Sequence, residues 1–230
     1  MHFHIVTLFP KALHSYLGES ILKRAVEDKK VKVSFYNPRN FVKDKWKRTR
    51  PNDRSHSVGR VDRPPYAGGP GMVIQAEPVV YAIEGALRKI KNKKYKIIFL
   101  SPSGKQFTNE YAGKISQKYK NIIIVCGRYE GIDARVKKIF SASRRMDEIS
   151  VGPFILTGGE LPAMVIMDVM ARQVPGVLGN LDSLEERRVS SSEVYTRPEV
   201  FKYKNKLYRV PKVLLSGHRA RIEEWKKRHN

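Results

Sequence analysis

The sequence has little cysteine, few acidic residues and no long apolar run. Its single cysteine, Cys126, excludes an internal disulfide and any metal site built from a cysteine cluster. The most apolar window, residues 153–171, contains Glu160 and Asp168, so no segment reads as a membrane span. The N-terminus has no basic segment leading into an apolar core, so we expect no export signal. These absences predict a soluble, cytoplasmic protein with no membrane partner.

The shortage of acidic residues leaves a large positive charge. Lys and Arg total 45 against 22 Asp and Glu in 230 residues, a formal net charge of +23. So basic a chain repels itself unless a polyanion screens it, which makes nucleic acid the leading partner. A charged run is usually only a solvated face, but these runs have few acids and contain aromatic residues. They favour phosphate contacts and base stacking, and they cover Lys29–Arg63, Arg88–Lys96 and Arg197–Arg228, with Trp46, Tyr66, Tyr203, Tyr208 and Trp225 among or near them.

Apolar periodicity predicts an α/β fold with a mostly parallel sheet and helices on both faces. Pro78 is expected to open one helix and Thr108 to cap another. Strand-like and helix-like segments alternate along the chain. We expect strands at 3–9, 31–35, 96–100, 122–126 and 154–156, and helices near 21–26, 78–90, 108–119, 134–140 and 162–173.

Composition divides the chain into a large domain, a linker and a basic appendage. We place the large domain at 1–175, the linker at 176–192 and the appendage at 193–230, where a helix is expected near 219–227 after the segment 210–215. The large domain contains a long polar stretch at 37–75, and loops of such length are usually functional or disordered.

Three glycine-containing loops are expected at the carboxyl edge of the sheet, where open α/β sheets bind ligands. They begin at Leu100, Gly127 and Val151. Ordinary turn chemistry would explain any one of them, but three loops on one edge favour a site where backbone can approach a ligand closely. Neither a G-x-G-x-x-G nor a P-loop motif is present, and the histidines lack metal-ligand spacing.

Several long motifs follow one another along nearly the whole chain and together resemble a known family. The chain is similar to the bacterial tRNA (guanine-N1)-methyltransferases of the TrmD family, in the SPOUT class. The segments that carry this resemblance are Arg63-Pro-Pro-Tyr-Ala-Gly-Gly-Pro-Gly-Met72, Leu100-Ser-Pro102, Cys126-Gly-Arg-Tyr-Glu-Gly-Ile-Asp133, Leu156-Thr-Gly-Gly-Glu-Leu-Pro-Ala163, Pro175-Gly-Val-Leu-Gly179, Tyr195-Thr-Arg-Pro-Glu199 and Pro211-Lys-Val-Leu-Leu-Ser-Gly217.

The resemblance implies a deep trefoil knot in the large domain and a tRNA-binding role for the small one, although knotted chains are rare. It implies a homodimer with active sites between subunits, S-adenosylmethionine as methyl donor, a requirement for magnesium, and N1 of the guanine 3′ of the anticodon as acceptor. Carried over residue by residue, the donor contacts are Leu100, Ser101, Pro102, Gly127, Tyr129, Glu130, Gly131, Ser150, Val151, Gly152, Pro153, Phe154, Ile155, Leu156, Gly158 and Gly159.

Glu130 has two open roles, as an acid beside the sulfonium cation or as a group that helps to place magnesium. No metal ligand is assigned from the sequence. Two departures from the family pattern are the basic insert at 40–62 and the pair Pro153-Phe154, where Asp-Tyr is common.

The acceptor chemistry needs a base and a cation. Guanine N1 carries a proton and becomes a good nucleophile only when that proton leaves, while negative charge grows on O6. Arg172 matches the catalytic arginine of the family; without the resemblance it would be a helix-terminal cation that offsets the helix dipole. The family's carboxylate aligns with Ser191, so we favour Glu193 as base and keep Asp182 and Glu186 as alternatives.

Two other functions stay open at this level. A related SPOUT methyltransferase would act on ribosomal RNA or a ribose hydroxyl, and a non-catalytic RNA-binding protein would explain the charge. A pure binder has no need of three glycine loops at one sheet edge, and the motifs of the appendage favour the tRNA guanine enzyme.

Overall fold

The computed structural model describes the chain except for residues 43–59, 67, 92–93, 143–144, 180–190 and 230. The chain forms two units, Met1–Leu178 and Gly179–Asn230. The finer domain limits given above stay a prediction, because much of the expected linker lies outside the described residues.

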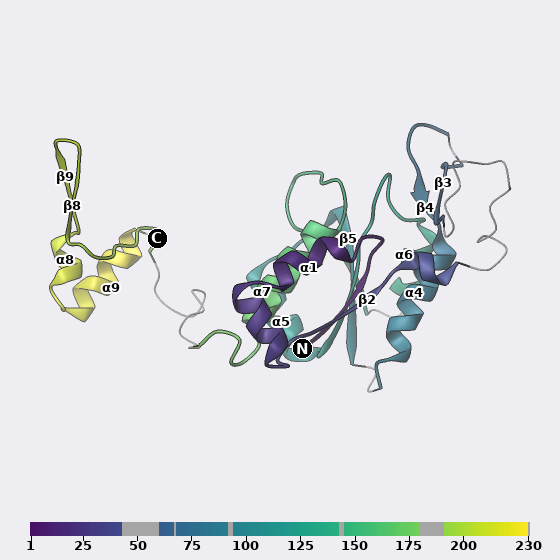
Figure 1. Cartoon of the computed structure of the whole chain (residues 1–230), viewed down its shortest axis with the longest axis horizontal. Coiled ribbons are helices and arrows are strands. Elements are labelled where there is room, and N and C mark those ends of the chain that lie inside the picture. The colour runs from purple at the N-terminus through teal and green to yellow at the C-terminus, as the bar shows by residue number, and fades with distance from the viewer. Residues whose placement is uncertain (43–59, 67, 92–93, 143–144, 180–190, 230) are drawn as a thin grey trace. The chain divides into compact units, whose positions relative to one another are not determined.

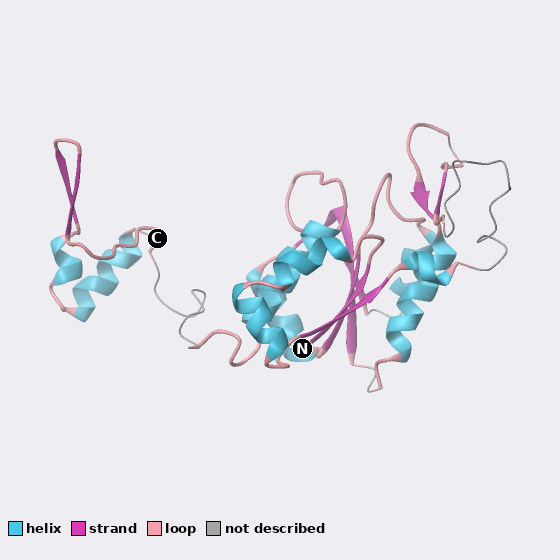
Figure 2. Ribbon diagram, in the orientation of Figure 1, coloured by secondary structure: helices cyan, strands magenta, loops and turns pink. Residues whose placement is uncertain are grey.

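A five-stranded parallel sheet organises the larger unit (Figure 2). The sheet order is β2-β1-β6-β5-β7, and each neighbouring pair is parallel. This confirms the mostly parallel α/β fold, whereas the passage of the chain through a knot stays a prediction. The strands are β1 (His2–Val6), β2 (Lys32–Tyr36), β5 (Tyr95–Gln106), β6 (Asn121–Val125) and β7 (Met146–Ser150).

Helices cover both faces of this sheet, as the continuous apolar run in β6 requires. Alternate side chains of β6 point to opposite faces, so Ile122 and Ile124 join one buried cluster while Ile123 and Val125 join the other. One face carries α1 (Lys11–Leu17), α2 (Ser20–Glu27), α5 (Asn109–Lys118) and α7 (Glu160–Arg172); the other carries η1 (Pro38–Phe41), α4 (Ala76–Arg88) and α6 (Arg135–Ser141).

Local signals placed the expected helices of the larger unit to within about one turn, but α1 was not anticipated. Thr108 caps α5, since its Oγ1 accepts a hydrogen bond from the Tyr111 amide at 3.1 Å. Helix α4 starts at Ala76 rather than at Pro78, and α7 starts at Glu160 rather than at Pro162. Both prolines therefore lie in a first turn, where the missing N–H has no intrahelical partner to lose.

The strand expected at 154–156 is wrong, and the last strand of the sheet is β7 instead. Its sequence Met-Asp-Glu-Ile-Ser lacks the apolar run of an interior strand, and β7 lies at the edge of the sheet. Lys96 Nζ lies 2.7 Å from an Asp147 oxygen, and Lys137 Nζ lies 2.9 Å from a Glu148 oxygen. These partners from β5 and α6 compensate the two acids, which is why β7 can pair with β5.

Strand β5 makes a short detour that builds one edge of the site. Leu100 and Lys105 both pair with Ile149 of β7, so residues 101–104 leave the ladder and return to it at the same place. Gly104 closes the detour, because a Cβ there would lie 2.6 Å from the Ile149 backbone. The detour holds Ser101 and Pro102 at the carboxyl end of the sheet.

Two small hairpins complete the described structure. In the larger unit, β3 (Asp62–Arg63) pairs with β4 (Val73–Ile74). The smaller unit contains β8 (Val200–Tyr203), β9 (Lys206–Arg209), α8 (Lys212–Leu215) and α9 (Arg219–Arg228) (Figure 1). Helix α9 matches the sequence expectation, but neither α8 nor the β8–β9 hairpin was anticipated. No helix of the described residues is long and apolar enough to span a membrane.

Candidate active site

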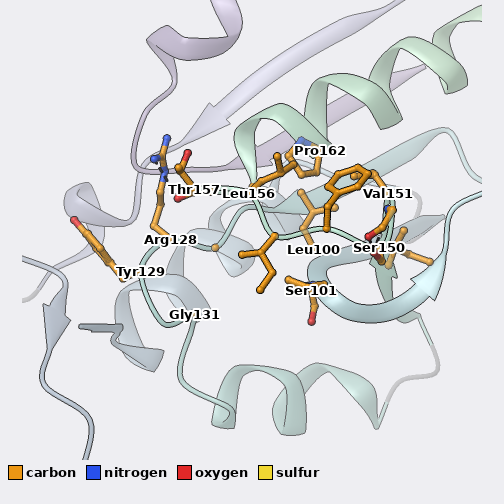
Figure 3. Close-up of a pocket in the computed structure, with 18 of the residues that line it drawn as sticks. Leu100, Ser101, Arg128, Tyr129, Gly131, Ser150, Val151, Leu156, Thr157 and Pro162 are labelled. Atoms are coloured by element: carbon orange, nitrogen blue, oxygen red, sulfur yellow. Dashed lines mark hydrogen bonds between the residues drawn. The ribbon is translucent and has the colours of Figure 1, made fainter. Parts of the chain in front are cut away.

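The three loops expected at the carboxyl edge of the sheet surround one cavity of about 270 Å³ (Figure 3). Every residue that the resemblance assigned to the donor lines this cavity except Pro153. The loops follow three different strands, and parallel pairing brings their ends together. Four further lining residues were missed from the sequence: Arg128, Ile149, Thr157 and Pro162.

The walls of the cavity combine apolar side chains with a few polar groups. Leu100, Leu156 and Pro162 come from three separate segments and lie close together in Figure 3. Hydroxyl groups of Ser101 and Ser150 lie along the same cavity. A cleft with apolar walls and a few polar groups is the usual form of a small-molecule site.

Glycines allow two of the loops to cross at close range. The Gly159 amide donates to the Gly127 carbonyl at 2.8 Å, and Arg128 forms an antiparallel bridge with Gly158. A Cβ on Gly158 would collide with the Arg128 side chain, and one on Gly159 would lie 2.6 Å from Cys126 Cα. Side chains at these two positions are therefore incompatible with the crossing.

Strained backbone shapes the loop that follows β6. Tyr129 has a φ of 58°, and Gly131 has a φ of 118°. A positive φ is uncommon for a residue with a Cβ, and such strain concentrates at functional sites. The Glu130 amide donates to the Met72 carbonyl at 3.0 Å, which fixes the loop against the segment before β4.

A buried ion pair joins the same two loops from behind. Glu160 is 3% exposed, and both of its carboxylate oxygens have partners. Thr7 Oγ1 donates to Oε1 at 2.7 Å, and Arg128 Nε donates to Oε2 at 2.9 Å. The guanidinium also donates to the Thr157 carbonyl at 3.3 Å and lies 4.7 Å from the centre of the Phe9 ring. A charged group this deep is tolerated only when it is paired and hydrogen-bonded.

Cys126 lies directly before this loop and is fully buried. Burial raises the pKa of its thiol well above the usual range, and the nearby Glu160 carboxylate adds to the shift. The thiol is therefore protonated at neutral pH, which excludes Cys126 as a thiolate nucleophile.

Glu130 is the acidic side chain that reaches the rim of the cavity. It packs against Gly71, where a Cβ would lie 2.5 Å from Glu130 Oε1. Gly71 has a φ of 86°, so glycine suits both the backbone and the contact. The described residues contain no group of three His, Cys, Asp or Glu side chains that could hold a metal ion.

Neither Arg172 nor Glu193, the residues expected to act on the guanine, is among those that line the cavity. Arg172 ends α7, about 18 Å along the helix from Glu160 at its start. Glu193 belongs to the smaller unit, is exposed, and accepts a hydrogen bond from the Tyr195 hydroxyl at 2.7 Å. The alternatives Asp182 and Glu186 lie outside the described residues, as does most of the basic insert.

Comparison with known proteins agrees with these motifs. A family model described as tRNA (Guanine-1)-methyltransferase TrmD matches residues 1–230. A tRNA (guanine-N(1)-)-methyltransferase of Campylobacter jejuni subsp. doylei is 43% identical over 230 residues, which are 98% of this chain and 90% of the relative. The enzymes of the same name from Caldanaerobacter subterraneus subsp. tengcongensis and Clostridioides difficile are 44% and 38% identical, over 99% of this chain and 86% and 91% of theirs.

Removing Glu160 should destabilise the larger unit. Glu160→Ala leaves the Arg128 guanidinium without its buried partner, so we expect the free energy of unfolding to fall by about 3–5 kcal/mol. Urea denaturation followed by circular dichroism measures this change. The control is Glu84→Ala, which removes an exposed partner of Arg88 within α4 and should cost about 0.5 kcal/mol or less. Equal losses in the two variants would contradict the prediction.

Proposed function

This chain belongs to the TrmD family of tRNA (guanine-1)-methyltransferases, and we propose that it methylates N1 of the guanine 3′ of the anticodon from the cavity described above. The observation that carries this placement is the meeting of three strand-end loops around one cavity. A protein that only binds RNA has no use for such a cavity. Because the substrate is tRNA, we assign the reaction to the cytoplasm.

The donor S-adenosylmethionine fits the chemistry of the cavity. Its adenine needs apolar walls, which Leu100, Val151 and Leu156 supply, together with backbone groups that can approach closely at Gly127. Its sulfonium carries a positive charge, which the Glu130 carboxylate at the rim would favour. These side chains would bind and orient the donor, which supplies the methyl group.

Two groups of this chain activate the guanine. A carboxylate takes the N1 proton, so that the N1 lone pair can attack the methyl carbon as the carbon–sulfur bond breaks. A cation stabilises the negative charge that grows on O6. We assign the cation to Arg172, which matches the catalytic arginine of the family. We assign the base to Glu193, the carboxylate nearest to Ser191, which occupies the position of the family's acid.

The position of Arg172 argues for a site shared between two copies. Within one copy, Arg172 lies ten residues along α7 from Pro162 in the cavity wall, about 15 Å along the helix axis. Leu161 and Val165 are exposed on the same side of α7 as Arg172, at spacings of four and seven residues. Two copies that pack these faces around a two-fold axis perpendicular to the helix place their α7 helices antiparallel. The Arg172 of each copy then approaches the cavity of its partner.

Glu130 has an alternative role, in which it would hold magnesium instead of facing the sulfonium. Magnesium is usually held by one or two carboxylates with substrate oxygens and water, rather than by a full protein cage. Glu130 meets that requirement, and the ion would supply positive charge at the rim. The absence of a three-ligand cluster among the described residues is compatible with this arrangement.

A bulky residue at Gly127 should abolish donor binding and leave the fold intact. A Cβ at this position would meet nothing closer than Ile132 Cγ1 at 3.8 Å, so the protein itself has room for it. Gly127→Val should nevertheless block backbone approach to the donor. Isothermal calorimetry with S-adenosylmethionine measures the loss. Gly113→Ala, at an open position in α5, should bind the donor normally. Unchanged donor affinity in Gly127→Val would count against the placement.

Arg172→Ala should keep donor binding and lower the single-turnover methylation rate by roughly a hundredfold or more, the scale for loss of one oxyanion donor.

A mixture of two variants tests whether the site is shared between copies. When the inactive Arg172→Ala and Gly127→Val proteins exchange subunits, one of the two sites in each mixed dimer has both parts intact. Activity should therefore return on mixing. No recovery, with mixed dimers demonstrated, would place Arg172 in the same copy as its cavity or outside the site.

Glu193→Gln tests the base. It keeps the size of the side chain and removes its proton-accepting charge, so methylation near neutral pH should fall by roughly a hundredfold or more. Part of the rate should return at higher pH, where solvent removes the guanine proton. Glu199→Gln changes the same charge in the same unit and should act normally. A wild-type rate for Glu193→Gln across the pH range would exclude Glu193 and turn attention to Asp182 and Glu186.

A further inference from the structure

One face of the β8–β9 hairpin carries a group of aromatic rings. Phe201 of β8 lies opposite Tyr208 of β9, and Tyr203 lies opposite Lys206. Opposed residues of an antiparallel pair share a face, and so do residues two apart along a strand. Phe201, Tyr203 and Tyr208 therefore lie on one face, which we call the aromatic face. Lys202, Leu207 and Arg209 lie on the other.

These rings contribute little to a core within their own unit. Phe201, Tyr203 and Tyr208 are 58%, 55% and 48% exposed. Figure 1 shows the hairpin projecting away from α8 and α9 rather than packing on them. An isolated two-stranded hairpin is only marginally stable in water, so burial within the unit does not explain the presence of three large rings. Contact with a binding partner would explain it.

The charge around the rings indicates what that partner is. The segment from Val200 to Lys212 contains lysines and arginine and no acidic residue. Lys204 Nζ lies 5.6 Å from the centre of the Tyr203 ring, and Lys206 Nζ lies 5.5 Å from that of Tyr208. Cations beside exposed rings suit a ligand that combines phosphates with flat bases. A protein partner would need a strongly acidic surface to bind this hairpin.

We propose that the aromatic face is an RNA-stacking surface that binds unpaired bases of the tRNA substrate, while the neighbouring lysines contact phosphates. This inference rests on the proposed function, because it concerns the substrate of the same enzyme. Base–aromatic stacking is tolerant of sequence, since every base has a flat face. The hairpin therefore strengthens tRNA binding and positions the RNA, and the choice of the methylated guanine is made elsewhere.

The experiment compares variants of the full chain in tRNA binding and methylation. Phe201→Leu and Tyr208→Leu keep an apolar cross-strand pair but remove the rings. Each should raise the Kd and the KM for tRNA by about 5- to 150-fold, the scale of one lost stack. The value of kcat at saturating tRNA and the donor affinity should stay unchanged. Tyr208→Phe keeps the ring and should bind tRNA normally, while Leu207→Ala changes the opposite face and should have no effect.

The salt dependence separates stacking from charge. Loss of a ring removes no phosphate contact, so the slope of log affinity against log salt should stay the same in Tyr208→Leu. Lys204→Gln should reduce that slope by about one phosphate contact. Normal tRNA binding by both leucine variants would overturn the proposal. So would a change in sedimentation without a change in tRNA binding, since it would make the face a contact between copies.

The wild-type protein distinguishes this inference from the function on which it rests. If the wild type methylates the guanine and the leucine variants have an unchanged KM, the hairpin inference fails and the function stands. If the wild type binds tRNA through the hairpin but transfers no methyl group, the proposed reaction fails and the stacking surface stands.

Discussion

The ion pair between Arg128 and Glu160 is the interaction on which the candidate active site depends. It joins the loop after β6 to the first turn of α7, so it fixes two walls of the cavity at once. Its geometry is demanding, because a buried carboxylate must have all of its partners. Thr7 supplies the second partner from the end of β1. Three segments that are distant in sequence are therefore held together by one carboxylate.

Helix α7 fixes the position of Arg172 relative to this ion pair. Its first residue, Glu160, is locked behind the cavity, and its last, Arg172, is held at a fixed distance by the rigid helix. Arg172 lies about 15 Å along the helix axis from Pro162 in the cavity wall. This separation is the reason why the proposed role of Arg172 calls for a second copy of the chain. The exposed apolar residues Leu161 and Val165 on the same face offer a physical reason for such pairing.

Charge and shape have different roles in RNA recognition by this protein. A net charge of +23 attracts any polyanion and gives affinity that falls with salt. Such attraction does not select one guanine, and it does not hold the RNA in one register. In the proposed function, rings such as Tyr203 and Tyr208 would add contacts with defined geometry, and the cavity would hold the reactive donor. The basic surface therefore recruits the substrate, and the more specific contacts position it.

Much of the fold and site is encoded locally in the sequence, and those parts were predictable. The alternating faces of β6, the cap at Thr108 and the three strand-end loops depend on residues close together in the chain. Motif resemblance added the family and nearly all of the cavity lining. Tertiary structure decided the rest: β7 forms because Lys96 and Lys137 compensate its acids, and the Arg128 pair forms only when β1, β6 and α7 meet. Such contacts join residues that are far apart in sequence, and no local pattern records them.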